Sequence, residues 1–186
     1  MNKTKLMRYP VLITIIGSVL MLLMLFLPFA SATEDYKEKL LKYEDEMYVE
    51  EIGMTNGEAV NISLFEFGKM YVEAANQGMH KEISIACIVI ISLFAGFSIL
   101  TLLLSLFKKS MGIIIFDLLA IGTFKIICFD FEDRGVLPSS SFDWGIVSWM
   151  VYVIGILVFA GAIWLFVEKR KAKKIAKVEQ VAAVQE

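Results

Sequence analysis

Four apolar runs, each long enough to cross a membrane as a helix, constrain the fold of this chain more than any other feature. The runs are residues 9–32, 83–107, 111–131 and 145–167. An α-helix needs about 20 predominantly apolar residues to cross a hydrocarbon core of ~30 Å. With 58% hydrophobic and 20% charged residues, the 186-residue chain lies outside the composition of soluble domains. Because lipid offers the backbone no hydrogen-bond partners, the sequence predicts an all-α membrane protein, a bundle of four transmembrane helices.

Charged residues alternate between the two sides of the predicted bundle. Basic residues lie in 1–8, in the short turn at 108–110 and in the C-terminal tail at 168–186, while residues 33–82 and 132–144 are acidic. The longer acidic segment holds twelve Asp or Glu and five Lys. By the positive-inside rule, both termini and the turn are cytoplasmic, and both acidic loops are extracytoplasmic. The sequence therefore predicts a multi-pass protein of the plasma (cell) membrane.

The first run has two interpretations. A basic start, an apolar stretch and Ala-Ser-Ala at 30–32 together match the pattern of a cleaved signal peptide. The apolar core at 11–29, however, has nineteen residues, whereas the apolar region of a signal peptide has about 7–15. We therefore interpret residues 9–32 as the first transmembrane helix, with cleavage as the alternative.

The acidic segment between the first two runs is predicted to be mainly helical. Ser31 with Glu34, and Ser63 with Glu66, have the spacing of capping boxes, each before an amphipathic helical pattern. Asn-Gly at 56–57 favours a hairpin turn or a loop between these helices. About fifty residues without a disulfide or a metal form only a marginal core. We therefore expect the segment to pack on the outer rim of the bundle or to present its aromatic side chains to a partner.

Two ionisable residues, Asp117 and Lys125, lie inside the third apolar run. A charge in the hydrocarbon core costs at least ~2.5–3.5 kcal/mol, so each group needs a partner, water or a route to the membrane surface. On a helix they are ~12 Å apart along the axis and ~80° apart around it, which is too far for a direct pair.

Asp117 and Lys125 are therefore interpreted separately. At the depth of Asp117 the other runs place Thr14 and Thr101, so a protonated Asp117 bonded to either hydroxyl is the structural interpretation. Lys125 is close enough to the outer surface for its amine to reach the acidic loop. The alternative is that both residues line a polar path through the membrane.

The two cysteines, Cys87 and Cys128, lie at similar depth on helices that the short turn at 108–110 makes neighbours. A disulfide between them requires Cα atoms within ~7 Å. We expect instead that both are buried as small apolar side chains, since buried cysteines behave in that way, and the disulfide is the alternative.

Residues suited to catalysis or metal binding are scarce. The chain has a single histidine, His80, and no glycine-rich phosphate loop. The acidic residues of the second outer loop lack the order of a calcium-binding loop, and Arg134 occupies a position where a ligand would lie. The sequence therefore predicts a non-enzymatic protein without a cofactor or a metal. The net charge of the acidic segment also argues against nucleic acid as a partner.

The C-terminal tail is predicted to extend the fourth helix into the cytoplasm. Basic residues next to a bilayer attract anionic lipid with ~1 kcal/mol each. The candidates for that contact are Lys169, Arg170, Lys171, Lys173 and Lys174. The alternative is that these residues serve only as a positive-inside orientation signal.

The order of runs and loops is similar to that of claudin-type tetraspans, with a long first and a short second outer loop. The claudin loop signature W…G-L-W-C-C is absent, because residues 33–82 hold neither tryptophan nor cysteine. The resemblance is therefore one of topology and implies no roles for individual residues.

Two functions from different classes fit these patterns. The first is a non-enzymatic accessory or scaffold subunit, in which the acidic segment and the helix-packing faces bind a protein partner or further copies of the chain. The second is a small transporter or channel component with a polar path through Asp117 and Lys125. With either function, the transmembrane helices are expected to be in contact with the lipid bilayer.

Overall fold

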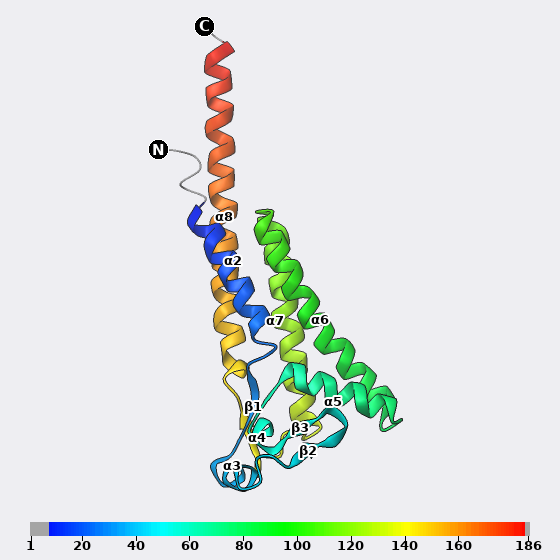
Figure 1. Ribbon diagram of the computed structural model, residues 1–186. Helices are drawn as coiled ribbons and strands as arrows, with labels where there is room; N and C mark the ends of the chain where they lie inside the picture. The colour runs from blue at the N-terminus through cyan, green and yellow to red at the C-terminus, as the bar shows by residue number, and fades with distance from the viewer. Residues whose placement is uncertain (1–7, 185–186) are drawn as a thin grey trace.

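The computed structural model describes residues 8–184, with side chains up to residue 176. The chain is mostly helical, and four helices that pack against one another form its long axis (Figure 1). They are α2 (Arg8–Leu23), α6 (Lys81–Leu106), α7 (Ser110–Asp133) and α8 (Val147–Val184). Each of the four helices begins within a few residues of the start of a predicted apolar run.

Within the described residues, three helices are long and apolar enough to cross a membrane, namely α6, α7 and α8. The fourth, α2, is a shorter apolar helix. The helix predicted over 9–32 ends earlier than expected, because α2 stops at Leu23 and Pro28–Ala32 forms strand β1. Pro28 contributes to this ending: proline has no backbone N–H to donate and disfavours helical geometry in the residue before it.

Strand β1 is the centre of a three-stranded antiparallel sheet of order β4-β1-β5. Its partners are β4 (Asn61–Ser63) and β5 (Phe142–Trp144). Ala30 pairs with Ile62 on one side and with Trp144 on the other. The sheet therefore joins the end of the first apolar run to both acidic loops. Neither β1 nor β5 was predicted from the sequence, since segments of three to five residues carry almost no periodicity of their own.

The acidic segment contains strands as well as the predicted helices. Its remaining elements are α3 (Glu34–Leu41), β2 (Met47–Val49), the 3₁₀ helix η1 (Glu50–Ile52), β3 (Met54–Thr55), α4 (Asn56–Ala59) and α5 (Leu64–Asn76). β2 and β3 pair as a hairpin, but the chain reverses through η1 and Gly53, which has a φ of 66°. The hairpin turn, one of the two alternatives at Asn-Gly, is therefore not formed there. Asn56 instead begins α4 after the N-cap Thr55.

One of the two predicted capping boxes is confirmed. At the start of α5, the Glu66 N–H donates to Ser63 Oγ at 3.2 Å, and the Ser63 N–H donates to Glu66 Oε2 at 2.7 Å. The box predicted at Ser31 is wrong, because Ser31 belongs to strand β1. The residue before α3 is Thr33, whose side chain makes no capping hydrogen bond.

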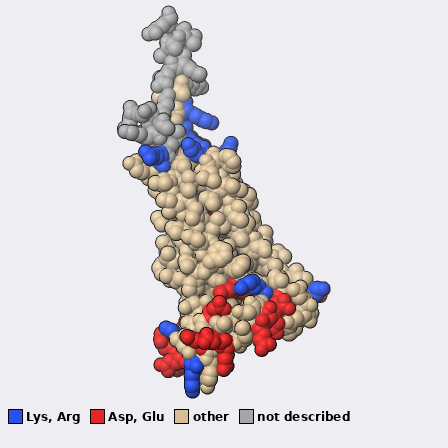
Figure 2. Space-filling model, viewed as in Figure 1, with Lys and Arg blue, Asp and Glu red and all other residues tan. Residues whose placement is uncertain are grey.

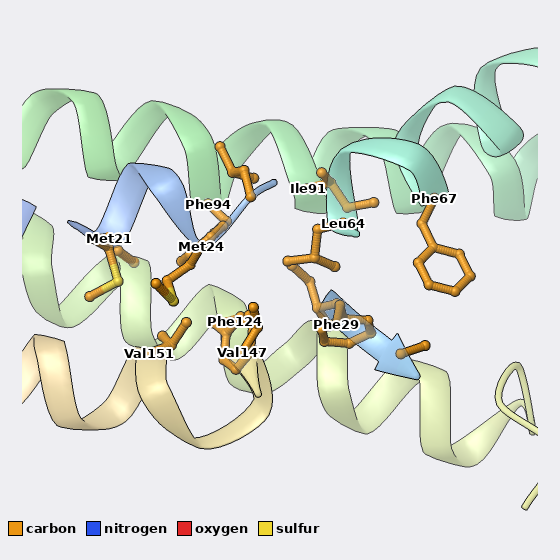
Figure 3. Close-up of a cluster of buried hydrophobic side chains, with 14 of the residues drawn as sticks. Met21, Met24, Phe29, Leu64, Phe67, Ile91, Phe94, Phe124, Val147 and Val151 are labelled. Carbon is orange, nitrogen blue, oxygen red and sulfur yellow. The ribbon is translucent and has the colours of Figure 1, made fainter. Parts of the chain in front are cut away.

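Phe29 connects the sheet to the helix bundle. Its side chain is fully buried, and its ring makes edge-to-face contacts with Phe67, Phe124, Phe131 and Trp144 at centroid distances of 5.2–6.0 Å. These partners belong to α5, α7 and β5, so one residue contacts three separate elements. Figure 3 shows Phe29 among the buried side chains contributed by the helices around it. Edge-to-face pairs contribute about 0.5–1.5 kcal/mol beyond the area that they bury.

Small residues bring α2 and α8 together. A Cβ atom at Gly17 would lie 2.4 Å from Val158 Cγ2, and one at Gly161 would lie 2.9 Å from Ile13 Cγ2. The two backbones therefore approach each other as closely as glycine allows at two levels, which is the packing expected between helices in lipid.

Charged residues separate to the two ends of the molecule. Figure 2 shows most of the acidic side chains at the end formed by the sheet and the short helices, with some basic ones among them, while the charged side chains visible toward the opposite end are basic. We call residues 28–80 together with 142–144 the acidic cap. The helix bundle between the two ends has a largely uncharged surface in this view.

Candidate functional site

The interior of the bundle contains a layer of buried polar side chains from α2, α6 and α7. Asp117 is 1% exposed, Thr14 is 0% exposed and Thr101 is 2% exposed. Ser18 and Ser105, also fully buried, place their hydroxyl oxygens 3.4 Å apart across the α2–α6 contact. The structure therefore places Thr14 and Thr101, like Asp117, in the interior of the bundle.

The hydroxyl groups of this layer donate to their own helices. Thr14 Oγ1 donates to the Val11 carbonyl at 2.9 Å, and Thr101 Oγ1 donates to the Phe97 carbonyl at 2.8 Å. Serine and threonine within a helix commonly satisfy their donor in this way. Neither threonine therefore offers its proton to Asp117.

Asp117 has one oxygen without a hydrogen-bond partner. Among the described residues, Oδ2 of this carboxyl is the one buried side-chain oxygen or nitrogen that lacks a partner. The predicted hydrogen bond between Asp117 and Thr101 or Thr14 is absent from the bonds formed by residues 8–176. A buried polar atom left unpaired costs ~1–3 kcal/mol, so Asp117 lowers the stability of the bundle as it stands.

Lys125 lies on a different face of α7 from Asp117. Its side chain is exposed on the bundle surface, whereas Asp117 faces the interior. Lys125 is in neither of the ion pairs formed by the described side chains, and Asp130, one of the acidic residues near it, pairs with Arg134 instead. The two ionisable residues of the third run therefore occupy separate environments.

Cys87 and Cys128 are both free, so the disulfide kept as an alternative is not formed. Cys87 is buried and contacts the end of α7 through polar groups: its Sγ accepts from Arg134 Nη2 at 3.1 Å and lies 3.7 Å from Asp130 Oδ2. Cys128 is half-buried. Similar depth on neighbouring helices did not bring the two thiols together, because depth does not specify the face of the helix.

Arg134 links three helices at the acidic end of the bundle. Its Nε donates to Asp130 Oδ1 at 2.9 Å, its Nη2 pairs with Asp130 Oδ2, and Nη2 also donates to the Tyr71 hydroxyl at 3.0 Å. With Cys87 on α6, this group joins α5, α6 and the end of α7. We call Tyr71, Cys87, Asp130 and Arg134 the arginine cluster.

Two groups of the arginine cluster keep one charge state. The hydrogen bonds that Arg134 donates to Asp130 raise the pKa of Arg134, and burial raises the pKa of Tyr71 to about 12. The guanidinium stays protonated and the phenol stays neutral at physiological pH. The cluster was not predicted from the sequence. The i, i+4 spacing of Asp130 and Arg134 could have indicated their ion pair, but not the contacts with Tyr71 and Cys87.

An apolar groove lies between α5 and α6, with a volume of about 490 Å³. Ile52 of η1 and Leu25, which follows α2 in the chain, complete its walls. Two of its lining residues are charged, Lys69 and Glu73, and both belong to α5. The sequence analysis did not predict the groove, because it exists only where α5 crosses α6.

The basic tail continues α8 as one helix through Val184, as predicted. Of the five proposed lipid contacts, Arg170, Lys171, Lys173 and Lys174 are exposed. Lys169 is half-buried and its amine donates to the Lys108 carbonyl at the α6–α7 turn. Lys169 therefore connects α8 to that turn. The other four basic side chains remain exposed.

Within residues 8–176, no group of three or more His, Cys, Asp or Glu side chains is arranged to hold a metal ion. No protein-family model, curated protein or solved structure matches this chain.

Proposed function

We propose that this protein is a small integral membrane protein with four transmembrane helices, and that it acts as a non-enzymatic accessory or scaffold subunit. In this proposal α2 crosses the membrane with α6, α7 and α8. A helix of 16 residues is ~24 Å long, so residues 24–27 complete the passage before the cap begins at Pro28. Non-helical backbone is tolerated at that depth where protein covers it, and Met24 and Leu25 are buried.

The positive-inside rule sets the orientation in this proposal. The N-terminus, the α6–α7 turn and the tail lie in the cytoplasm, and the acidic cap lies outside the plasma membrane. The separation of charge in Figure 2 supports the assignment. The four exposed basic residues of the tail then lie within reach of anionic lipid headgroups.

The observation that carries the proposed role is the fixed position of the acidic cap. The burial of Phe29 against Phe124 of α7 and the arginine cluster both hold the cap against the bundle. Its exposed carboxylates therefore form a fixed array, which reduces the ordering cost of binding. The exposed acidic residues are Glu34, Asp35, Glu38, Glu44, Asp45, Glu46, Glu50, Glu51, Glu58 and Asp143. A partner with a basic surface, or a basic surface on a second copy, complements this array.

The second candidate, a transporter or channel component, is favoured by the unpaired oxygen of Asp117. A path that uses both ionisable residues requires them to share one cavity. Asp117 instead faces the bundle interior, while Lys125 lies on the outer surface. The accessory role is therefore the better supported of the two.

The test places a photo-crosslinking residue at Leu41, an exposed cap position, in the full chain in its native membrane. We expect a discrete protein adduct that weakens when Glu44, Asp45 and Glu46 are replaced together by Gln, Asn and Gln. The matched control replaces Lys37, Lys39 and Lys42 by Gln, and we expect the adduct to persist. Absence of any protein adduct from the cap would contradict the accessory role. An ion flux in proteoliposomes that disappears with Asp117→Asn would support the transporter role in its place.

A further inference from the structure

The groove between α5 and α6 exists because small residues meet where the two helices cross. α5 lies across α6 near the acidic end of the bundle (Figure 1). Gly68 faces Ile91 across the crossing, and a Cβ atom at Gly68 would lie at an ordinary van der Waals distance of 4.0 Å from Ile91 Cγ2. Ser92 and Ala95 line the opposite wall with short side chains. The volume of about 490 Å³ falls in the ~300–1,000 Å³ range of small-molecule sites.

The floor of the groove lies along an apolar helix. Ile88 and Ala95 both line it, and seven residues of α6 correspond to ~10 Å along the helix axis. In the four-helix proposal this stretch is in the hydrocarbon layer, in the leaflet next to the acidic cap. Lipid acyl chains are the apolar molecules present at that level. One chain lying along α6 would cover the groove.

The rim of the groove carries two opposite charges. Lys69 and Glu73 are one helical turn apart on α5, and both line the groove. The ion pairs formed by the described side chains do not include either of them. Lysine preceding glutamate by four residues is the weaker orientation for a pair within a helix. Lys69 lies over the Phe65 ring at 5.8 Å, and Glu73 Oε1 accepts from Gln77 Nε2 at 3.3 Å.

This arrangement complements a zwitterionic lipid headgroup that has hydrogen-bond donors. Lys69 can bind a phosphate, and Glu73 can accept hydrogen bonds from a primary ammonium. A choline headgroup carries the positive charge without an N–H donor. A glycerol headgroup leaves the lipid with a net negative charge, which Glu73 repels.

We infer that the α5–α6 groove is a binding site for one phospholipid with a phosphoethanolamine headgroup, its phosphate at Lys69, its ammonium at Glu73 and one acyl chain along α6. The inference rests on the proposed position of α6 in the membrane. It does not depend on whether the acidic cap binds a protein.

The first test measures lipid adducts of the purified full chain by native mass spectrometry. Phosphatidylethanolamine, phosphatidylcholine and phosphatidylglycerol with identical acyl chains are added separately to delipidated protein. We expect the ethanolamine lipid to bind about tenfold more tightly than the other two, which is the discrimination that one charge-assisted hydrogen bond supplies. Equal binding of all three lipids would overturn the inference and leave only non-selective annular lipid.

Two pairs of variants locate the site. Gly68→Leu fills the groove and is expected to lower ethanolamine-lipid binding about tenfold. Gly96→Leu is its control, because a Cβ atom there meets no described atom within 4 Å. Glu73→Gln is expected to remove the preference for ethanolamine over choline while choline-lipid binding is unchanged. Glu82→Gln, at an exposed acidic residue outside the groove lining, is expected to keep the preference.

The folding of each variant is checked separately, so that a loss of lipid binding is not mistaken for a loss of folded protein. Each variant is compared with the native chain by thermal unfolding in detergent, and Glu73→Gln changes a rim side chain that is not part of the apolar core. If Glu73→Gln and Gly68→Leu both keep the native lipid preference, the inference is wrong. A photo-crosslinker at Ser92 that yields a protein adduct and no lipid adduct would instead assign the groove to a partner helix.

Discussion

At the scale of single residues, α7 shows three outcomes for a polar side chain in an apolar helix. Asp117 is buried, and its Oδ2 atom has no partner among the described residues. Lys125 faces outward from the bundle. Asp130, near the end of the helix, is held by Arg134. Position along the helix and the face on which a residue lies together decide which outcome applies.

Asp117→Asn is expected to change the free energy of unfolding by less than ~1 kcal/mol, because no described group depends on the charge of the carboxyl. Asp117→Lys is expected to lower it by about 3–5 kcal/mol or to prevent accumulation of the protein, since it leaves an uncompensated charge in the interior. Thermal unfolding in detergent measures both. The control is Lys125→Asn, an exposed position with a small expected effect. A large loss with Asp117→Asn would show that the carboxylate itself is needed.

Arg134→Ala is expected to lower the free energy of unfolding by about 1–2 kcal/mol, because Tyr71 and Asp130 lose a shared donor that is partly exposed to solvent. It should also increase the rate at which a maleimide modifies Cys87, whose thiol the guanidinium now contacts. Cys128 in the same chain is the internal control. Arg134→Lys is expected to restore only part of the protection, since lysine lacks the planar fork. Unchanged Cys87 reactivity in Arg134→Ala would contradict the described role of the cluster.

At the scale of elements, β1 is the strand on which the fold of the cap depends. Of its two neighbours in the sheet, β4 precedes α6 in the chain and β5 follows α7. The Phe29 side chain of β1 enters the bundle core. The backbone after β5 also fits closely against it: the Gly145 N–H donates to the Phe29 carbonyl at 2.8 Å. A Cβ atom at Gly145 would lie 2.2 Å from the Pro28 carbonyl oxygen.

Gly145→Ala is therefore expected to destabilise the protein by about 1–3 kcal/mol, because the atom that it meets is backbone and the strand has to move. Limited proteolysis of the cap and thermal unfolding report the change. Gly122→Ala is the matched control, since a Cβ atom at Gly122 meets no described atom within 4 Å. If both variants are equally stable, the close contact between β1 and the start of α8 is not needed for the fold.

At the scale of the whole molecule, the proposed orientation in the membrane rests on the separation of the acidic and basic ends. Both ends of the described chain and the α6–α7 turn lie away from the acidic cap (Figure 1). Only a chain with an even number of crossings places both termini on one side. The three long apolar helices alone would separate them, so the side on which Arg8 lies decides whether α2 also spans.

Single cysteines at Arg8, Asp45 and Lys109, introduced after Cys87 and Cys128 are replaced by Ala, test this topology. We expect a membrane-impermeant maleimide to label Asp45→Cys in intact cells, and to label Arg8→Cys and Lys109→Cys only after the membrane is permeabilised. Labelling of Arg8→Cys in intact cells would show that α2 does not cross the membrane. Western blotting of each variant confirms equal amounts of protein.

Several features of the fold were predictable from sequence because their causes are local. The positions of α6, α7 and α8 follow from runs of apolar residues, and the start of α5 follows from the spacing of Ser63 and Glu66. The separation of Asp117 from Lys125 follows from the geometry of a single helix. In each case, neighbouring residues contain all the information that the prediction needs.

The partners of individual side chains were not predictable in the same way. Cys87 contacts Arg134 rather than Cys128, and the Thr101 hydroxyl donates to its own helix rather than to Asp117. Each outcome depends on how the helices rotate about their axes as they pack, and a difference of one helix face exchanges one neighbour for another.

By itself, the sequence determined that this chain is built from long apolar helices and that its acidic and basic residues separate along them, since hydrophobicity and helical periodicity act over a few turns. The tertiary structure alone decided that residues 28–32 leave the helix to pair with 61–63 and 142–144, and that the crossing of α5 over α6 leaves a groove. The reason is that strand pairing and helix crossing join residues far apart in the chain, and their free energy appears only when both sides are in place.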